Sequence, residues 1–229
     1  ANEDSQVFET AVSSAEDYAL GVYGRGVPIG ILDDGLDIAH ADLVENMLSG
    51  GSYDFKTRSA TPLASSLTGI HGTSVAGLAA ARGGNGVGIW GMAPLAKLQG
   101  FNLLTSGEFD AERASLGDAS AREIYPGLRS DLTQVFNKSY GENPDIVPEP
   151  GSNSTILVSE VLEIMRVQTE TARQGKGAIY VKAGGNEFKG GNIFSSSWCR
   201  EAIAAEMTCY NVNQETEKNT PYQIGVGAF

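Results

Sequence analysis

The chain has two histidines, His40 and His71, and these are its candidates for a general base. Acyl transfer by a side-chain nucleophile needs such a base, a carboxylate that orients it, and donors for the developing oxyanion. Asp33 directly follows an apolar segment, 27–32, and His71 opens a segment rich in small side chains, 71–81. A histidine at the start of a helix is by itself more often structural. An aspartate that closes a strand and a histidine that opens the next helix can nevertheless form the carboxylate and base of a catalytic triad.

The elements that must position these side chains follow from the hydrophobic pattern. Segment 27–32 is apolar on both alternating faces, which is typical of a strand buried in a parallel sheet, and 71–81 predicts a helix packed closely on that sheet. Further strands are predicted at 97–103, 134–139, 178–182 and 223–229, with amphipathic helices at 109–124 and 155–174. Alternating strands and helices predict an α/β fold in three layers, αβα, with a mainly parallel central sheet. In such sheets, chemistry gathers beyond the carboxyl ends of the strands.

Composition narrows the class of partner. The chain of 229 residues carries 16 basic and 28 acidic residues, a net charge of −12, which argues against nucleic acid and anionic membranes and suits a cationic peptide. No segment predicts a transmembrane helix, and 1–6 do not resemble a signal peptide. We therefore expect a soluble, single domain over 1–229. Cys199 and Cys209 form either a local disulfide, which suits a secreted or periplasmic protein, or two separate thiols.

Several motifs in order carry a resemblance to a known family. They occupy 31–36, 40–43, 71–77, 85–94 and 177–186. Together they resemble the Asp, His and oxyanion motifs of subtilases, the subtilisin-like serine proteases, and Asp33-Asp34-Gly35 resembles the kexin-like branch. The resemblance implies a secreted serine endopeptidase in which Asp33 orients the imidazole, His71 acts as general base and then acid, and Asn186 donates its amide to the oxyanion. It implies a structural role for His40.

The same resemblance implies where a peptide or protein substrate binds. Asp34 would face a basic residue of the substrate, although it could instead cap the turn before Gly35. The edge segment that pairs with an extended substrate would be Ser139, Tyr140 and Gly141. A preference for basic residues stays open, because Pro144 stands where kexins place an acidic residue of the pocket.

A structural calcium ion is implied as well. Its ligands would be the side chains of Asp42 and Asn85 with mostly carbonyl oxygens from the loop after the histidine helix, since hard cations prefer oxygen ligands. The set is Asp42, Arg82, Asn85, Val87 and Ile89. The alternative is a solvated turn.

The nucleophile is the missing part of the motif set. Subtilases carry their serine in Gly-Thr-Ser-x-Ala-x-Pro, and this pattern does not occur before Phe229, since Ser74 belongs to the histidine motif. We expect a catalytic domain that is incomplete at its C-terminal side and inactive alone, with a C-terminal fragment that carries the serine, a propeptide or a chaperone as partners. A non-catalytic domain that binds peptides or a partner is the alternative. A dinucleotide-binding domain is disfavoured, because no glycine-rich fingerprint follows segment 27–32.

Overall fold

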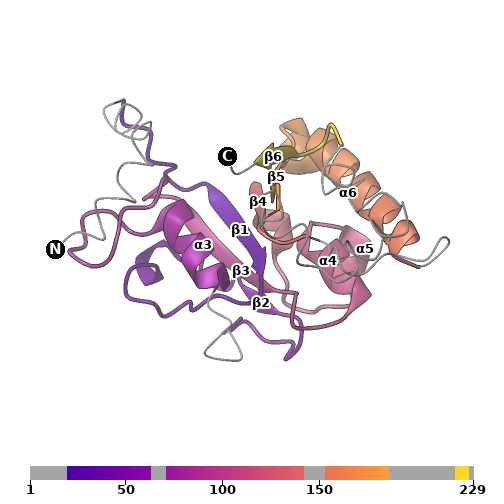
Figure 1. Cartoon of the computed structure of the whole chain (residues 1–229), viewed down its shortest axis with the longest axis horizontal. Helices are drawn as coiled ribbons and strands as arrows, with labels where there is room; N and C mark the ends of the chain where they lie inside the picture. Colours follow the sequence, from indigo (N-terminus) through magenta and orange to yellow (C-terminus); the bar gives the residue numbers. More distant parts are fainter. Residues whose placement is uncertain (1–19, 63–70, 142–152, 186–219, 227–229) are drawn as a thin grey trace, which may run out of the picture. The chain divides into compact units, whose positions relative to one another are not determined.

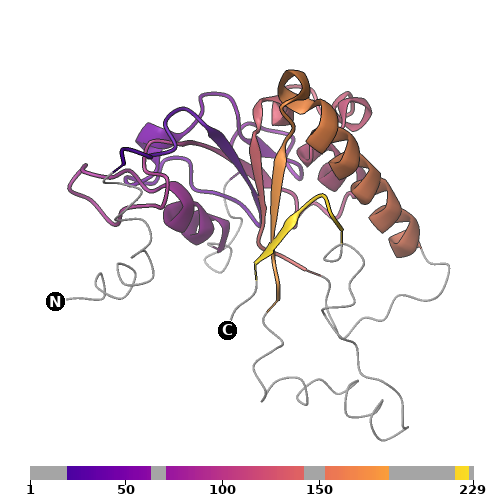
Figure 2. The same ribbon diagram turned by 90° about the horizontal axis from the view of Figure 1, so that it is seen from above.

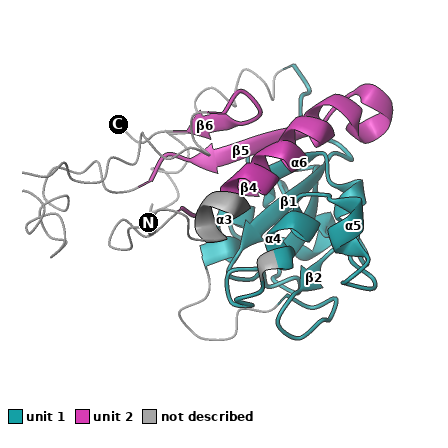
Figure 3. Ribbon diagram, turned by 90° about the vertical axis from the view of Figure 1, so that its right-hand side faces the viewer, with its two compact units in different colours: residues 1–136 teal, residues 137–229 magenta. Residues whose placement is uncertain are grey.

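The structure, a computed structural model, describes residues 20–62, 71–141, 153–185 and 220–226. The chain forms two compact units, Ala1–Phe136 and Asn137–Phe229 (Figure 3). The single domain expected over 1–229 stays a prediction.

The first unit is built on parallel strands. Strand β1 (Pro28–Asp33) pairs with β3 (Lys97–Asn102) over its whole length, from Pro28 opposite Lys97 to Asp33 opposite Asn102. Strand β2 (Tyr53–Asp54), which the pattern did not predict, pairs with the other edge of β3. The start of β4 (Val135–Lys138) lies on the free side of β1, where the N–H of Gln134 donates to the carbonyl of Pro28.

Helix α3 (His71–Ala80) packs against β1 and β3 (Figure 1). Its buried residues, Gly72, Ala76 and Ala80, recur every four positions and therefore lie on one face of the helix. Small side chains on that face let the helix axis come close to the sheet. The core beneath it consists of Ile31, Leu36, Leu43, Ala76, Ala80, Ala81, Ala96 and Leu98.

The helix predicted over 109–124 is wrong as a single element. The structure has two short helices, α4 (Phe109–Ser115) and α5 (Ala119–Arg122). Gly117 between them has φ of 99°, a left-handed conformation that ends a helix. The Asp118 carboxylate then accepts the N–H of Ser120 and caps α5. Two 3-10 turns, η1 (Val44–Asn46) and η2 (Ser130–Leu132), complete the unit.

The second unit contains the rest of β4, helix α6 (Asn153–Gly175), and strands β5 (Ile179–Ala183) and β6 (Ile224–Val226). Strand β6 runs parallel to β5, with Val181 opposite Ile224, and Figure 2 shows the yellow β6 beside the orange β5. Helical geometry in α6 ends before Ala172, because three residues there leave helical φ and ψ. None of the helices in the described residues is long and apolar enough to cross a bilayer.

The predicted α/β architecture with a mainly parallel sheet is confirmed. Every strand pairing of β1, β2 and β3, and that of β5 with β6, is parallel. The predicted and observed ends of β1, β3, β4 and β5 differ by at most one residue. Parallel strands place their carboxyl ends at one edge of a sheet, so Asp33 lies at the edge where sites of this class form.

Candidate active site

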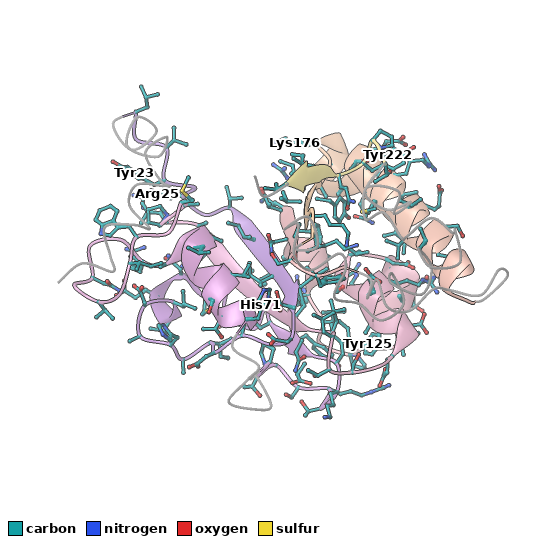
Figure 4. The ribbon with its side chains drawn as sticks, viewed as in Figure 1. Tyr23, Arg25, His71, Tyr125, Lys176 and Tyr222 are labelled. Atoms are coloured by element: carbon teal, nitrogen blue, oxygen red, sulfur yellow. The ribbon has the colours of Figure 1, made fainter. Side chains whose placement is uncertain are left out.

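Asp33 and His71 meet at the carboxyl end of β1. Both carboxylate oxygens of Asp33 lie 2.9 Å from Nδ1 of His71. Figure 4 labels His71 at the beginning of α3. A carboxylate at this distance keeps the proton on Nδ1, since the N–H can then donate to it. Nε2 is thereby left as the basic nitrogen of the neutral ring.

The two partners differ in exposure. The side chain of Asp33 is 1% exposed, whereas that of His71 is 57% exposed. Burial raises the pKa of Asp33 above its ordinary value of 3.8, while the N–H of Asp34 and the His71 ring act in the opposite direction. A buried, oriented acceptor beside an accessible imidazole is the arrangement that a general base requires.

Asp34 links the strand to the helix. Its N–H donates to Oδ1 of Asp33 over 2.8 Å, and its own Oδ1 accepts the N–H of Gly72 over 3.0 Å. That N–H belongs to the first turn of α3 and has no partner within the helix. In the structure Asp34 therefore caps the start of α3. The resemblance implies a substrate contact for the same residue in addition. Asp34 is half-buried.

Gly72 is required by the close approach of α3 to β1. A Cβ atom at this position would lie 2.8 Å from Cβ of Asp33 and would collide with the carbonyl oxygen of Gly35. Only a residue without a side chain allows His71, one residue earlier, to sit beside Asp33. A further tie comes from Thr73, whose hydroxyl accepts the N–H of Asp37 over 2.9 Å.

The residues proposed for calcium lie around Asp42. This side chain is 3% exposed; its Oδ1 lies 3.2 Å from Nδ2 of Asn85, and its Oδ2 accepts the N–H of Ile89 over 2.9 Å. The N–H of Arg82 donates to the carbonyl of Asp42. Val87 belongs to the same loop, and its N–H donates to Oδ1 of Asn85.

This donor set fits calcium in its chemistry, with one carboxylate, one amide and backbone carbonyls. Within the described residues, no cluster of three or more His, Cys, Asp or Glu side chains could hold a metal. His40 accepts the N–H of Asp42 at its Nδ1, a contact with the backbone of this loop region.

The predicted substrate edge lies in the second unit. Ser139, Tyr140 and Gly141 directly follow β4. The hydroxyl of Ser139 accepts from Nδ2 of Asn137, and the carbonyl of Tyr140 accepts from Nζ of Lys182 over 2.8 Å. Gly141 is exposed. Asn186, Cys199 and Cys209 lie outside the described residues, so the oxyanion and disulfide predictions stay predictions.

Two features of the site were not predicted. The first is the bond from Gly72 to Asp34, for which the only signal was the acidic residue after the strand. The second is a pair of buried lysines, Lys138 and Lys182, beside Tyr140. The sequence signal for their burial was the alternating pattern of the strands, because each lysine stands two positions after a buried aromatic residue and so lies on the same face.

The sequence is similar to those of known proteases over most of its length. The chain is 39% identical over 174 residues to the "Aeromonas extracellular serine protease" of Aeromonas sobria, which covers 75% of the chain and 25% of that protein. It is 33% identical over 208 residues to "Kexin" of Saccharomyces cerevisiae, covering 91% of the chain and 22% of that protein. The chain thus spans about a quarter of the length of these curated relatives.

A solved structure agrees with these matches. The crystal structure of the Aeromonas sobria serine protease with the chaperone ORF2 matches with a TM-score of 0.60 and 39% identity, over 72% of this chain and 26% of that one. The model of the subtilase family matches residues 24–224, which include both Asp33 and His71. The resemblance predicted from the motifs, including that to kexins, is confirmed. An aspartate that closes β1, a histidine that opens α3 and a family match over most of the sequence together establish that this chain belongs to the subtilase family.

Proposed function

We propose that this chain is the part of a secreted serine endopeptidase of the subtilisin and kexin type that supplies the aspartate and histidine of its triad. The observation that carries the proposal is the contact between Asp33 and Nδ1 of His71, with the outer part of the ring accessible. The family and its serine-protease relatives support the reaction class.

The contact between Asp33 and His71 supports the following mechanism. Asp33 holds His71 with its proton on Nδ1, so that Nε2 removes the proton of an attacking serine and later returns it to the leaving amine. Asp33 also stabilises the imidazolium that forms in between. Asn186 would donate to the oxyanion of the tetrahedral intermediate, a contribution worth roughly 100- to 1000-fold in turnover. The serine motif does not occur in the 229 residues, and we propose that a C-terminal fragment supplies the attacking serine.

The substrate would be an extended peptide bound along Ser139, Tyr140 and Gly141. Asp34 is half-buried, and one of its oxygens holds the start of α3. Its second oxygen would attract a basic residue of the substrate, which supports a preference for lysine or arginine. The Aeromonas sobria relative was solved with a chaperone, and we propose a chaperone or propeptide for this protein too.

Proteolysis of an unfolded protein tests the proposal. The protein that contains this chain is expected to cleave unfolded casein, and phenylmethylsulfonyl fluoride, which sulfonylates activated serines with loss of fluoride, is expected to stop the reaction. His71→Ala should abolish both cleavage and labelling. Mass spectrometry of the products reads the residue before each cut bond and so tests the basic preference.

The alternative is a subtilase-like domain that binds peptides without cutting them. It would be supported by tight peptide binding in calorimetry together with no casein cleavage and no labelling of serine. The same result would end the endopeptidase proposal.

Calcium removal gives a separate prediction. We propose that Asp42 and Asn85, with the carbonyls of Arg82, Val87 and Ile89, hold a structural calcium ion. A chelator is then expected to lower the Tm by several degrees, since an ion that binds only the folded state stabilises it. Asp42→Asn keeps an acceptor for the N–H of Ile89 but loses the charge, so its Tm should respond much less to chelator. An unchanged Tm in the unaltered protein would mean that the hydrogen bonds of Asp42 alone hold the loop.

A further inference from the structure

Two lysine side chains of the second unit, Lys138 and Lys182, are buried, and both lie near the aromatic ring of Tyr140. Lys138 is 0% exposed and Lys182 is 1% exposed. Their Nζ atoms lie 5.5 Å and 5.0 Å from the centre of the Tyr140 ring, within the range of a cation–π contact. Buried ammonium groups are rare because they lose water, so each must be held by specific contacts.

The two lysines lie on the buried faces of their strands. In β4 the buried positions alternate and include Phe136 and Lys138, and in β5 they include Tyr180 and Lys182. Burial at every second position means that each lysine points to the same side of its strand as the aromatic residue before it. Lysine at these positions breaks the apolar pattern, which indicates a specific role.

Lys182 makes the contact that matters for the substrate edge. Its Nζ donates to the carbonyl oxygen of Tyr140 over 2.8 Å. Along an extended chain, successive carbonyls point to opposite sides. A segment that pairs with a substrate as a strand is extended. With the carbonyl of Tyr140 held by Lys182, the backbone groups of Ser139 and Gly141 would then face the other side, where a peptide can add as a strand.

We propose that Lys182 is a positioning residue for substrate, which fixes Tyr140 by its carbonyl and its ring and thereby sets which backbone groups of Ser139–Gly141 an extended peptide can bind. This inference rests on the proposed function, because the resemblance assigns that segment to the substrate. Lys182 touches no reacting atom. Its effect should therefore depend on how much of the substrate lies along the edge.

The test compares two substrates of different length. One is an N-acetyl tetrapeptide p-nitroanilide, and the other is the N-acetyl p-nitrophenyl ester of its last residue alone. In Lys182→Met, kcat/KM for the tetrapeptide is expected to fall by about 10- to 100-fold, since a small misplacement of bound substrate is that costly. The ester, which makes no contact along the edge, should change by less than about 3-fold. Lys176→Met, at an exposed lysine of the same unit, is the matched control and should change neither.

An equal fall for both substrates, or no fall for either, would overturn the inference. A crystal structure of the unaltered protein with an extended peptide aldehyde tests it without any variant. The carbonyl of Tyr140 should stay on Lys182 while Ser139 and Gly141 bind the peptide, and a peptide bound by the Tyr140 carbonyl would contradict it.

The failure of the proposed function can be told apart from the failure of this inference. If the unaltered protein hydrolyses neither substrate, the endopeptidase proposal fails. Calorimetry then measures the affinity of the His71→Ala protein for the tetrapeptide acid, which binds along the segment Ser139–Gly141. Weaker binding by about 10-fold or more on adding Lys182→Met would support the positioning role, and unchanged binding would overturn it.

Discussion

Asp33→Asn is expected to lower kcat/KM by about 10⁴-fold, because asparagine allows the wrong tautomer of His71 and cannot stabilise the imidazolium. Both carboxylate oxygens of Asp33 lie 2.9 Å from Nδ1 of His71. Asparagine has nearly the same size and shape as aspartate, so the substitution removes the charge at this contact without leaving a gap. Peptide hydrolysis measured under kcat/KM conditions checks the result. Asp37→Asn is the matched control, since that carboxylate accepts the N–H of Ala39 in the same loop and should change activity by no more than about 3-fold.

The same substitution should also change how the stability of the protein depends on pH. Burial raises the pKa of Asp33 above 3.8, so the folded protein binds this proton more tightly than the unfolded chain does. The contribution of Asp33 to stability is therefore full below the unfolded pKa and is lost as pH rises through the higher folded pKa. Relative to the unaltered protein, Asp33→Asn should gain in Tm as pH is raised from about 3.5 to about 6. A Tm difference that becomes more negative over this range would contradict the raised pKa.

The second large effect is expected at Gly72. A methyl group there would meet the carbonyl of Gly35 and Cβ of Asp33, so Gly72→Ala must push α3 away from β1. Overpacking of this kind costs about 1–3 kcal/mol in the free energy of unfolding, and displacement of His71 should reduce kcat/KM by about 100-fold. Chemical denaturation and peptide hydrolysis measure the two losses.

Gly77 offers a control in the same helix. A Cβ added at Gly77 would have only Cδ1 of Ile89 near it, at 4.0 Å. Gly77→Ala should therefore stabilise the protein by about 0.5–1 kcal/mol, since alanine favours a helix over glycine, and should leave activity unchanged. If both substitutions behaved alike, the close approach of α3 to β1 at Gly72 would not be the cause.

The elements that carry the site could be predicted because their signals are local. A run of apolar residues that stops at Asp33 predicts the end of a buried strand, and the small residues after His71 predict a helix that can lie close to it. The structure has β1 ending at Asp33 and α3 beginning at His71. The contact between the side chains of Asp33 and His71 is a tertiary contact, and only the resemblance to the family motifs made it predictable.

The features that were missed depend on contacts between distant segments. The break between α4 and α5 arises from a left-handed Gly117, which an amphipathic pattern does not reveal. The bond from Gly72 to Asp34 joins residues 38 positions apart. Lysine is rarely buried, so the burial of Lys182 was not predicted although it stands two positions after the buried Tyr180. Its contact with the carbonyl of Tyr140 joins residues 42 positions apart.

The most direct test of the central claim is the protonation of His71 by nitrogen-15 NMR. A His71→Gln sample assigns the His71 signals, because these are the ring signals that disappear from its spectrum. Neutral His71 is expected to carry its proton on Nδ1, this proton is expected to resonate far downfield, and Asp33→Asn is expected to abolish the downfield signal. A neutral His71 with its proton on Nε2, or a ring signal that Asp33→Asn leaves unchanged, would contradict the central claim.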